Sequence, residues 1–272
     1  VKRRLTAKFA QHLQSEEARQ EHSAREGHTF LSKIVALNKS GKENMPIARV
    51  HGNLQTLFIA GADTTVSAML VCLWKIVTDT TGLQEELVEE VMAMPCLTTS
   101  SDITRQSLME GLPRIRSLFY EVVRSEGPAP QFMCQAATDF PLDQDVSLPA
   151  GTTFILPTQY LGTLPGSGIP EGPTGIPSSE FCPRRWLTTS PEGKVNGVIK
   201  PSNKTGVHLS TGFGSTPRIC PGQHVAELEA ILNLAAILQS FKVSISSDHP
   251  PMTLISKFTA YPDIDIELIL EP

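Results

Sequence analysis

The segment Phe213-Gly214-Ser215-Thr216-Pro217-Arg218-Ile219-Cys220-Pro221-Gly222 leads directly into a long apolar stretch near the C-terminus. Cys220 stands at the predicted start of a helix, because Pro221 suits the first helical position and apolar side chains recur after it at helical spacing. A helix N-terminus carries positive partial charge and Arg218 adds a full charge, so both favour a thiolate. Such a sulfur can act as a nucleophile, a redox thiol or a metal ligand.

Two interpretations of Cys220 compete. A lone cysteine is more often a buried structural residue. The glycines of the segment favour a functional role, because a backbone without Cβ atoms can approach a flat or bulky group, against which Phe213 could pack. Haem iron takes a Cys thiolate as its proximal ligand, and Arg218 is suited to hold a propionate carboxylate. We therefore predict that this segment ligates haem.

A second segment, Ala60-Gly61-Ala62-Asp63-Thr64-Thr65, interrupts an apolar pattern of helical period that runs from about residue 46 to 78. Gly and Thr are poor helix formers, at a cost of up to about 1 kcal/mol each. Small residues would let a ligand approach the backbone, while Asp63 and Thr64 would hold water and relay protons. The alternative is a kinked helix whose hydroxyls bond its own carbonyls. The pattern alone favours neither.

Together these segments resemble the cytochrome P-450 superfamily of haem-thiolate monooxygenases. The oxygen-binding helix of that family carries Ala/Gly-Gly-x-Asp/Glu-Thr-Thr/Ser, which the segment Ala60–Thr65 matches. Its proximal loop carries Phe-x-x-Gly-x-Arg-x-Cys-x-Gly, matched here at Phe213, Arg218, Cys220 and Gly222. The resemblance implies that haem b binds between these two segments, with the Cys220 thiolate on the iron.

Two further motifs follow in the order of the family. Glu121-Val122-Val123-Arg124 is similar to its Glu-x-x-Arg, and the segment from Phe181 to Trp186 is similar to its Phe-x-Pro-Glu-Arg-Phe/Trp. An i,i+3 acid–base pair is by itself a common surface feature. Apolar neighbours indicate burial here, and the resemblance implies that Arg185 completes a Glu121–Arg124–Arg185 triad through its fork of donors.

Three positions depart from the family pattern. Thr216 stands where a glycine is usual, and a β-branched residue is strained there if the backbone needs positive φ. Arg184 replaces a common glutamate. No basic residue lies between Ser125 and Leu156, where many relatives place a propionate-binding arginine near Cys134. These changes bear on haem affinity more than on the fold.

The expected fold is mainly α with small β-sheets, and it represents the C-terminal half of the P-450 fold. The resemblance covers the chain from about residue 25 onward, so residues 1–272 would form one partial domain. We expect helices over 5–38, 46–78 and 83–94, strands within 132–156, a terminal strand over 264–270 and an irregular loop over 162–180. The acidic side chains of the helix expected over 83–94 are predicted to be solvated. Asp102 is predicted to cap a short helix.

Composition narrows the class of protein. A net charge of −5 argues against nucleic-acid binding. The 5 cysteines are irregularly spaced, which is typical neither of a disulfide framework nor of a zinc site. We expect an intracellular protein. The sequence shows no signal peptide, and no stretch approaches the roughly twenty apolar residues of a spanning helix. Association with the endoplasmic reticulum membrane is expected only through an N-terminal part that this chain lacks.

The resemblance implies a haem-dependent monooxygenase that oxidises an apolar substrate such as a sterol, fatty acid or xenobiotic with O₂. Electrons would come from NAD(P)H through a reductase or ferredoxin, and Asp63 and Thr64 would guide protons. Three alternatives stay open: an isomerase or dehydratase, whose relatives commonly lose the acid–alcohol pair; a sterol 22-desaturase, suggested by residues 139–142 and 148–152; and a non-catalytic remnant or helical binding module.

Overall fold

The computed structural model describes residues 30–41, 45–97, 103–165, 175–199, 212–214, 218–256 and 259–272. The chain divides into two compact units, Val1–Gly61 and Ala62–Pro272, and the boundary falls inside one long helix. The candidate residues Ala60 and Gly61 belong to the first unit. All other candidate residues belong to the second.

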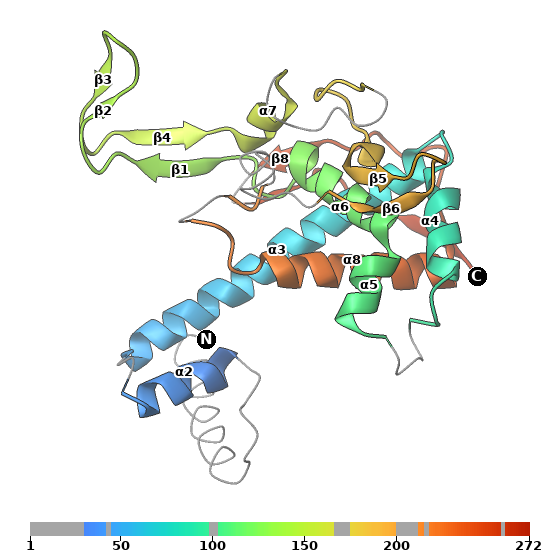
Figure 1. Ribbon diagram of the computed structural model, residues 1–272, viewed down its shortest axis with the longest axis horizontal. Coiled ribbons are helices and arrows are strands. Elements are labelled where there is room, and N and C mark those ends of the chain that lie inside the picture. Colours follow the sequence, from blue (N-terminus) through green and yellow to red (C-terminus); the bar gives the residue numbers. More distant parts are fainter. Residues whose placement is uncertain are drawn as a thin grey trace. The chain divides into compact units, whose positions relative to one another are not determined.

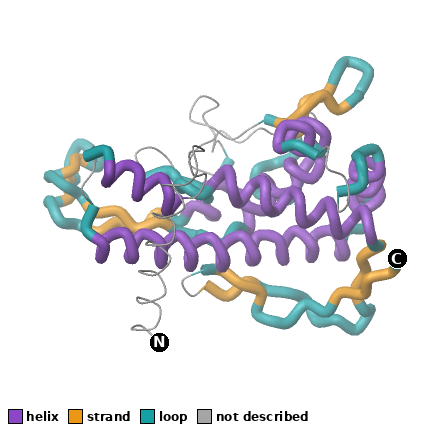
Figure 2. The backbone as a smooth tube through the Cα atoms, turned by 90° about the horizontal axis from the view of Figure 1, so that it is seen from below, coloured by secondary structure: helices purple, strands orange, loops and turns teal. Residues whose placement is uncertain are grey.

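Helices are the predominant secondary structure of the described chain (Figures 1 and 2). Their bounds are α2 (Phe30–Lys39), α3 (Ile47–Thr78), α4 (Leu83–Met92), α5 (Arg105–Gly111), α6 (Pro113–Glu126), α7 (Thr158–Thr163), the 3₁₀ turn η1 (Pro183–Trp186) and α8 (Gln223–Ser240). The α3 helix continues without interruption through the Ala60–Thr65 segment.

Strands form two-stranded antiparallel pairs. In the part of the chain that the structure describes, the pairs are β1 (Phe132–Gln135) with β4 (Thr153–Leu156), β2 (Phe140–Pro141) with β3 (Ser147–Leu148), β5 (Leu187–Thr189) with β6 (Val195–Val198), β7 (Lys242–Ile245) with β10 (Leu268–Glu271), and β8 (Leu254–Ser256) with β9 (Ala260–Pro262). The strands predicted within 132–156 are present. The predicted terminal strand is shorter than its alternating pattern, because only Leu268–Glu271 pairs with β7.

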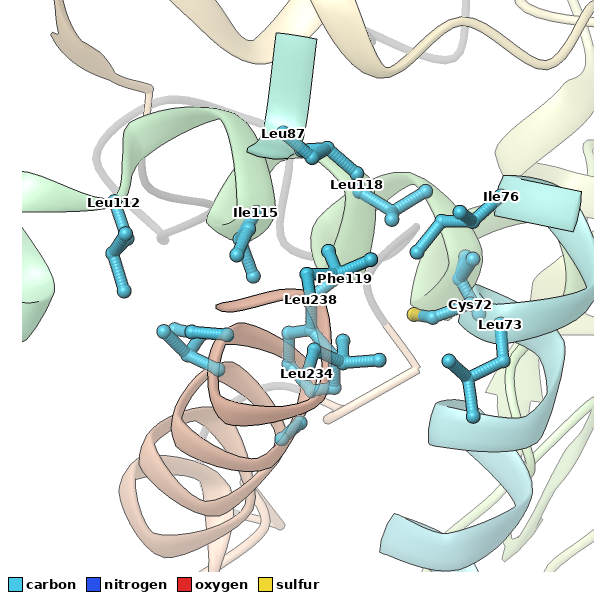
Figure 3. Close-up of a cluster of buried hydrophobic side chains, with 14 of the residues drawn as sticks. Cys72, Leu73, Ile76, Leu87, Leu112, Ile115, Leu118, Phe119, Leu234 and Leu238 are labelled. Carbon is cyan, nitrogen blue, oxygen red and sulfur yellow. The ribbon is translucent and has the colours of Figure 1, made fainter. Parts of the chain in front are cut away.

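The core of the second unit lies where the C-terminal half of α3, α6 and α8 meet (Figure 3). Cys72 and Ile76 of α3, Leu118 and Phe119 of α6 and Leu234 of α8 are almost fully buried. This cluster fixes the α8 helix against α6, and so it sets the position of the loop that precedes α8. A site built on the start of α8 therefore stands on a rigid base.

By length and composition alone, α3 could cross a membrane, contrary to the expectation that no stretch is long and apolar enough. Its apolar side chains have a second explanation in this fold. Residues Ala68–Ile76 of α3 supply core side chains that pack against α6 and α8. Core helices that are apolar on most sides pass the same composition test.

Several expectations fall partly outside the described residues. The helix predicted over 5–38 is described only from Phe30, as α2. Asp102 lies outside the described residues, and the α5 helix is instead capped by Thr104, whose side chain accepts from the Ser107 amide. In the loop expected over 162–180, the first two residues belong to α7, and 166–174 lie outside the described residues.

The acidic run of α4 is not uniformly solvated, and the expectation is wrong for Glu90. This carboxylate accepts hydrogen bonds from the first amides of α6, at 2.8 Å from Arg114 N and 3.1 Å from Ile115 N. The α6 helix has no side-chain cap of its own. A carboxylate from α4 therefore satisfies donors that every helix N-terminus leaves unpaired. The neighbouring Glu86 pairs with Arg184, whereas Glu85 and Glu89 are exposed as predicted.

The Glu90 contact predicts a pH dependence of stability. Burial raises the pKa of Glu90 from 4.5 to about 7, although the amides of α6 and the Arg114 charge oppose the shift. Between these two pH values the folded protein keeps a proton that the unfolded chain has released, so this group's contribution to stability falls as pH rises. We expect wild type to lose about 1–3 kcal/mol relative to Glu90→Gln from pH 4.5 to 7, measured by urea unfolding.

The matched control is Glu89→Gln, which removes an exposed acid from the same helix. Its unfolding free energy should run parallel to that of wild type across the same pH range. Parallel curves for wild type and Glu90→Gln would contradict the prediction.

Candidate functional site

A backbone hydrogen bond between described residues closes the loop before α8. The amide of Cys220 donates to the carbonyl of Phe213 at 2.8 Å. Gly212 and Gly214 adopt backbone φ values of 66° and 71°, which residues other than glycine rarely adopt. Thr216, whose strain was considered from the sequence, lies outside the described residues.

The glycines of the loop allow close packing against the protein itself. A Cβ on Gly212 would lie 3.0 Å from the Cγ1 atom of Val123 in α6, and one on Gly214 would lie 3.2 Å from the carbonyl oxygen of Arg218. The Phe213 ring stands 6.2 Å from that of Phe119, also in α6. Among the described residues, the atoms nearest these two glycines belong to α6, to Phe132 and to the loop's own backbone. This packing holds the loop on the core.

Cys220 differs from the core cysteine of α3. It is partly exposed just before α8, and the carbonyl of Gly222 accepts the first hydrogen bonds of that helix. Burial, with a smaller contribution from Glu126, raises the pKa of the Cys72 thiol, so Cys72 stays neutral in the core. The Cys220 sulfur lies 3.8 Å from where a Cβ on Gly222 would stand. The sequence-predicted ligand is therefore partly exposed and lies next to the N-cap residue of α8.

The acid–alcohol pair lies on one exposed turn of α3. Asp63 is exposed and Thr64 is partly buried. The hydroxyl of Tyr261 in β9 donates to the backbone carbonyl of Asp63 at 3.0 Å. Ala60 and Gly61 are also exposed, and a Cβ on Gly61 would meet no described atom within 4 Å. Small residues thus leave open space along this part of the helix.

The structure brings the three residues of the predicted triad together. The Glu121 carboxylate lies 2.6 Å from Arg124 Nη2 and 3.0 Å from Arg185 Nε, and all three side chains are fully buried. Three further donors bind this carboxylate: Arg124 Nε at 2.8 Å, the amide of Cys182 at 2.7 Å and the indole Nε1 of Trp186 at 2.9 Å. A buried carboxylate with this many donors is fully satisfied.

The remaining donors of the two arginines bind backbone carbonyls. Arg124 Nη1 donates to the carbonyls of Gly162 at 2.9 Å and Ser178 at 2.7 Å. Arg185 Nη2 donates to those of Pro177 at 3.0 Å and Glu180 at 2.7 Å. The excess positive charge of the triad is thus surrounded by carbonyl oxygens, as burial requires. The triad joins α6 to α7, η1 and the segment 176–180.

Arg184, the departure beside the triad, turns outward. Its guanidinium forms an ion pair with Glu86 of α4, and this hydrogen bond raises the pKa of the arginine. The extra charge therefore has its own partner on the neighbouring helix and leaves the triad unchanged.

One buried cluster, which lies at the first turns of α8 after the Cys220 loop, was missed from the sequence. The hydroxyl of Tyr120 donates to the Glu227 carboxylate, and Arg116 Nη2 lies 3.5 Å from the same oxygen. Burial and the Glu227 charge raise the pKa of Tyr120, so its hydroxyl stays a donor. Glu227 is an acid within the apolar face of α8, and this interruption was the available signal. The cluster fixes the first turns of α8 against α6.

The donor chemistry fits a haem thiolate. Among the described residues no three His, Cys, Asp or Glu side chains gather as a metal site. A structural zinc ion needs about four such ligands, whereas haem iron needs one from this side. Cys220 supplies one accessible sulfur, and the exposed Arg218 stands two positions before it. The residues present therefore suit a porphyrin iron better than a free metal ion.

Comparisons with known proteins agree with this chemistry. The family model described as Cytochrome P450 matches residues 2–267. The chain is 31% identical over 234 residues to cytochrome P450 72A397 of Kalopanax septemlobus, covering 85% of this chain and 40% of that relative. It is 24% identical over 246 residues to the mitochondrial cytochrome P450 11B2 of Mesocricetus auratus, covering 90% and 43% respectively.

The fold is similar to the crystal structure of a cytochrome P450, CYP102L1, with a TM-score of 0.66. The match has 23% sequence identity and covers 84% of this chain and 46% of that chain. The chain thus spans less than half the length of the relatives it matches, as expected of a partial fold. The predicted fold class, mainly helical with small antiparallel sheets, is confirmed. On its sequence and its fold, the chain belongs to the cytochrome P450 family.

Proposed function

We propose that this chain is part of a haem-thiolate monooxygenase that inserts one atom of O₂ into an apolar organic substrate. The observation that carries the proposal is the accessible Cys220 sulfur at the N-terminal end of α8, in a loop held by α6. The chain spans about 40% of the first relative's length, so the activity is proposed for a longer protein.

The proximal residues would hold the cofactor. Haem, when bound, supplies the iron at which dioxygen is activated, and thiolate ligation favours cleavage of the O–O bond of dioxygen. Cys220, just before α8, would bind the iron through its sulfur. Arg218 would pair with a propionate. Phe213 and Gly222 would shape the loop around the sulfur.

The α3 residues would provide space and protons. Ala60 and Gly61 would leave room for the cofactor beside the helix backbone. Thr64, partly buried, would hold a water or donate its hydroxyl proton, and the exposed Asp63 would take up the next proton from solvent. The overall reaction uses two protons and two electrons per O₂ and releases one water. We propose NAD(P)H as the electron source, through a reductase or ferredoxin.

The rival functions rest on fewer observations. The Asp63–Thr64 pair speaks against an isomerase or dehydratase, which needs no such proton supply. The sterol 22-desaturase option rests only on residues 139–142 and 148–152. We propose the compartment only as intracellular, because relatives named mitochondrial compete with the endoplasmic reticulum expectation. The non-catalytic remnant is the main alternative and is the one the experiment addresses.

The test is a carbon monoxide difference spectrum of the intact, haem-supplied protein after reduction. We expect the red-shifted Soret band that marks a thiolate-ligated haem. A sample that takes up no haem, or shows only the band of a neutral ligand, would favour the remnant over the monooxygenase.

A further inference from the structure

The β8–β9 hairpin contacts α3 at the turn that carries the acid–alcohol pair. The Tyr261 hydroxyl donates to the backbone carbonyl of Asp63 at 3.0 Å, between residues 198 positions apart in the chain. The neighbouring residue of β9, Ala260, accepts a buried hydrogen bond through its carbonyl from the hydroxyl of Ser67. Asp63 and Ser67 stand one helical turn apart on α3. Two consecutive strand residues therefore hold both ends of one turn.

The hairpin is itself fixed, so it can act as a support. In β8–β9, Ile255 pairs with Tyr261. The open end is closed by Thr253, whose amide and hydroxyl donate to the Asp263 carboxylate at 2.8 and 2.5 Å. These bonds lower the pKa of Asp263 and keep it ionised at neutral pH. The amide of Ala260 donates to the carbonyl of Pro128 at 2.9 Å, which ties the hairpin to the residues after α6.

The tyrosine is held in its donor form. Loss of hydration, followed by the negative charge of Asp63, raises the pKa of the Tyr261 hydroxyl. The hydroxyl therefore keeps its proton at neutral pH and remains a hydrogen-bond donor. A phenylalanine at this position would keep the ring and lose only this donor.

We propose that Tyr261 is a positioning residue, which together with Ser67 fixes the α3 turn that presents Asp63 and Thr64. This inference rests on the proposed function, because the pair needs a fixed orientation only if it delivers protons. A carbonyl pulled toward a strand holds the adjoining side chains in one direction. Proton transfer requires that donor and acceptor lie within hydrogen-bond distance. Loss of the Tyr261 hydrogen bond would let the Asp63 and Thr64 side chains vary in position and would make this distance less well defined.

The first measurement is hydrogen exchange in the intact protein, which needs no haem. Tyr261→Phe should speed exchange of the amides of residues 63–68 by about twofold to tenfold, the loss of one hydrogen bond. The matched control is Tyr160→Phe, which alters an exposed tyrosine of α7. If Tyr261→Phe exchanges at the wild-type rate, or if Tyr160→Phe speeds exchange equally, the anchoring of the α3 turn by Tyr261 would be overturned.

The second measurement separates positioning from mere support. The C–O stretching band of carbon monoxide on the reduced haem senses the polar groups of the α3 turn, and Thr64→Val calibrates that response. Tyr261→Phe should shift or broaden this band while the Soret position, set by the thiolate, stays as in wild type. An unchanged band with faster exchange would reduce Tyr261 to a structural residue and overturn the proposal.

Different results would contradict the monooxygenase proposal and the positioning role of Tyr261. If wild type shows no thiolate Soret band, the proposed function fails and the positioning role falls with it, whatever the exchange data show. If wild type shows the band and Tyr261→Phe leaves the C–O stretch unchanged, the monooxygenase proposal stands and only the role of Tyr261 is lost.

Discussion

Cys220→Ser removes the thiolate Soret band completely, while the protein keeps its helical content. This is the expected result if the sulfur at the start of α8 is the iron ligand. A serine hydroxyl has nearly the same size, but it does not ionise at neutral pH and is a poor ligand for haem iron. The side chain is only partly buried, so its replacement should cost little stability.

The matched control is Cys96→Ser, which changes an exposed cysteine that follows α4. It should leave the reduced carbon monoxide spectrum as in wild type. Haem uptake and far-ultraviolet circular dichroism, recorded on each variant, separate loss of the ligand from loss of the fold. A thiolate band that persists in Cys220→Ser, or disappears in Cys96→Ser, would show that Cys220 is not the ligand.

Glu121→Gln should cause the largest loss of stability of any single change considered for this chain. The carboxylate neutralises part of the charge of Arg124 and Arg185 in a fully buried site. Glutamine keeps the shape but removes the negative charge, and its amide group presents donors to the donors of Trp186 and Cys182. Removing one member of a buried ionic network typically costs about 3–5 kcal/mol.

Urea unfolding of the protein measures this loss, and Glu229→Gln, at an exposed acid of α8, is the control. The control should change the unfolding free energy by no more than about 0.5 kcal/mol. A Glu121→Gln loss as small as that of the control would mean that the carbonyls around the arginines suffice without the acid.

Short motifs allowed the backbone of the site to be predicted. Glu121 and Arg124 share one helix face, and the apolar neighbours of this pair indicated burial. The loop at Cys220 and its helix are likewise local, so residue type and spacing were enough to predict that Cys220 lies just before a helix. The α3 helix could be predicted from its period even though Gly61 and Thr64 lower its intrinsic propensity, because packing outweighs propensity in a core helix.

Contacts between distant segments could not be predicted this way. Glu90 looked like one more solvated acid, and only the approach of α6 gives it the amides of Arg114 and Ile115 as partners. The bond from Tyr261 to Asp63 joins segments 198 residues apart, and nothing near Tyr261 in the sequence indicates α3. Such pairs depend on the angle at which elements pack, which no local pattern encodes.

The hydrogen bonds of Arg124 to Gly162 and Ser178 affect how much the segment between these two residues can vary in length. One guanidinium nitrogen holds the carbonyls of Gly162 and Ser178, and so it fastens both flanks of the intervening stretch to a single side chain. Lengthening a connection whose ends are already anchored costs only about 0.6 kcal/mol for each doubling. Insertions and deletions between these two carbonyls can therefore accumulate in evolution while the ionic centre next to them keeps its geometry.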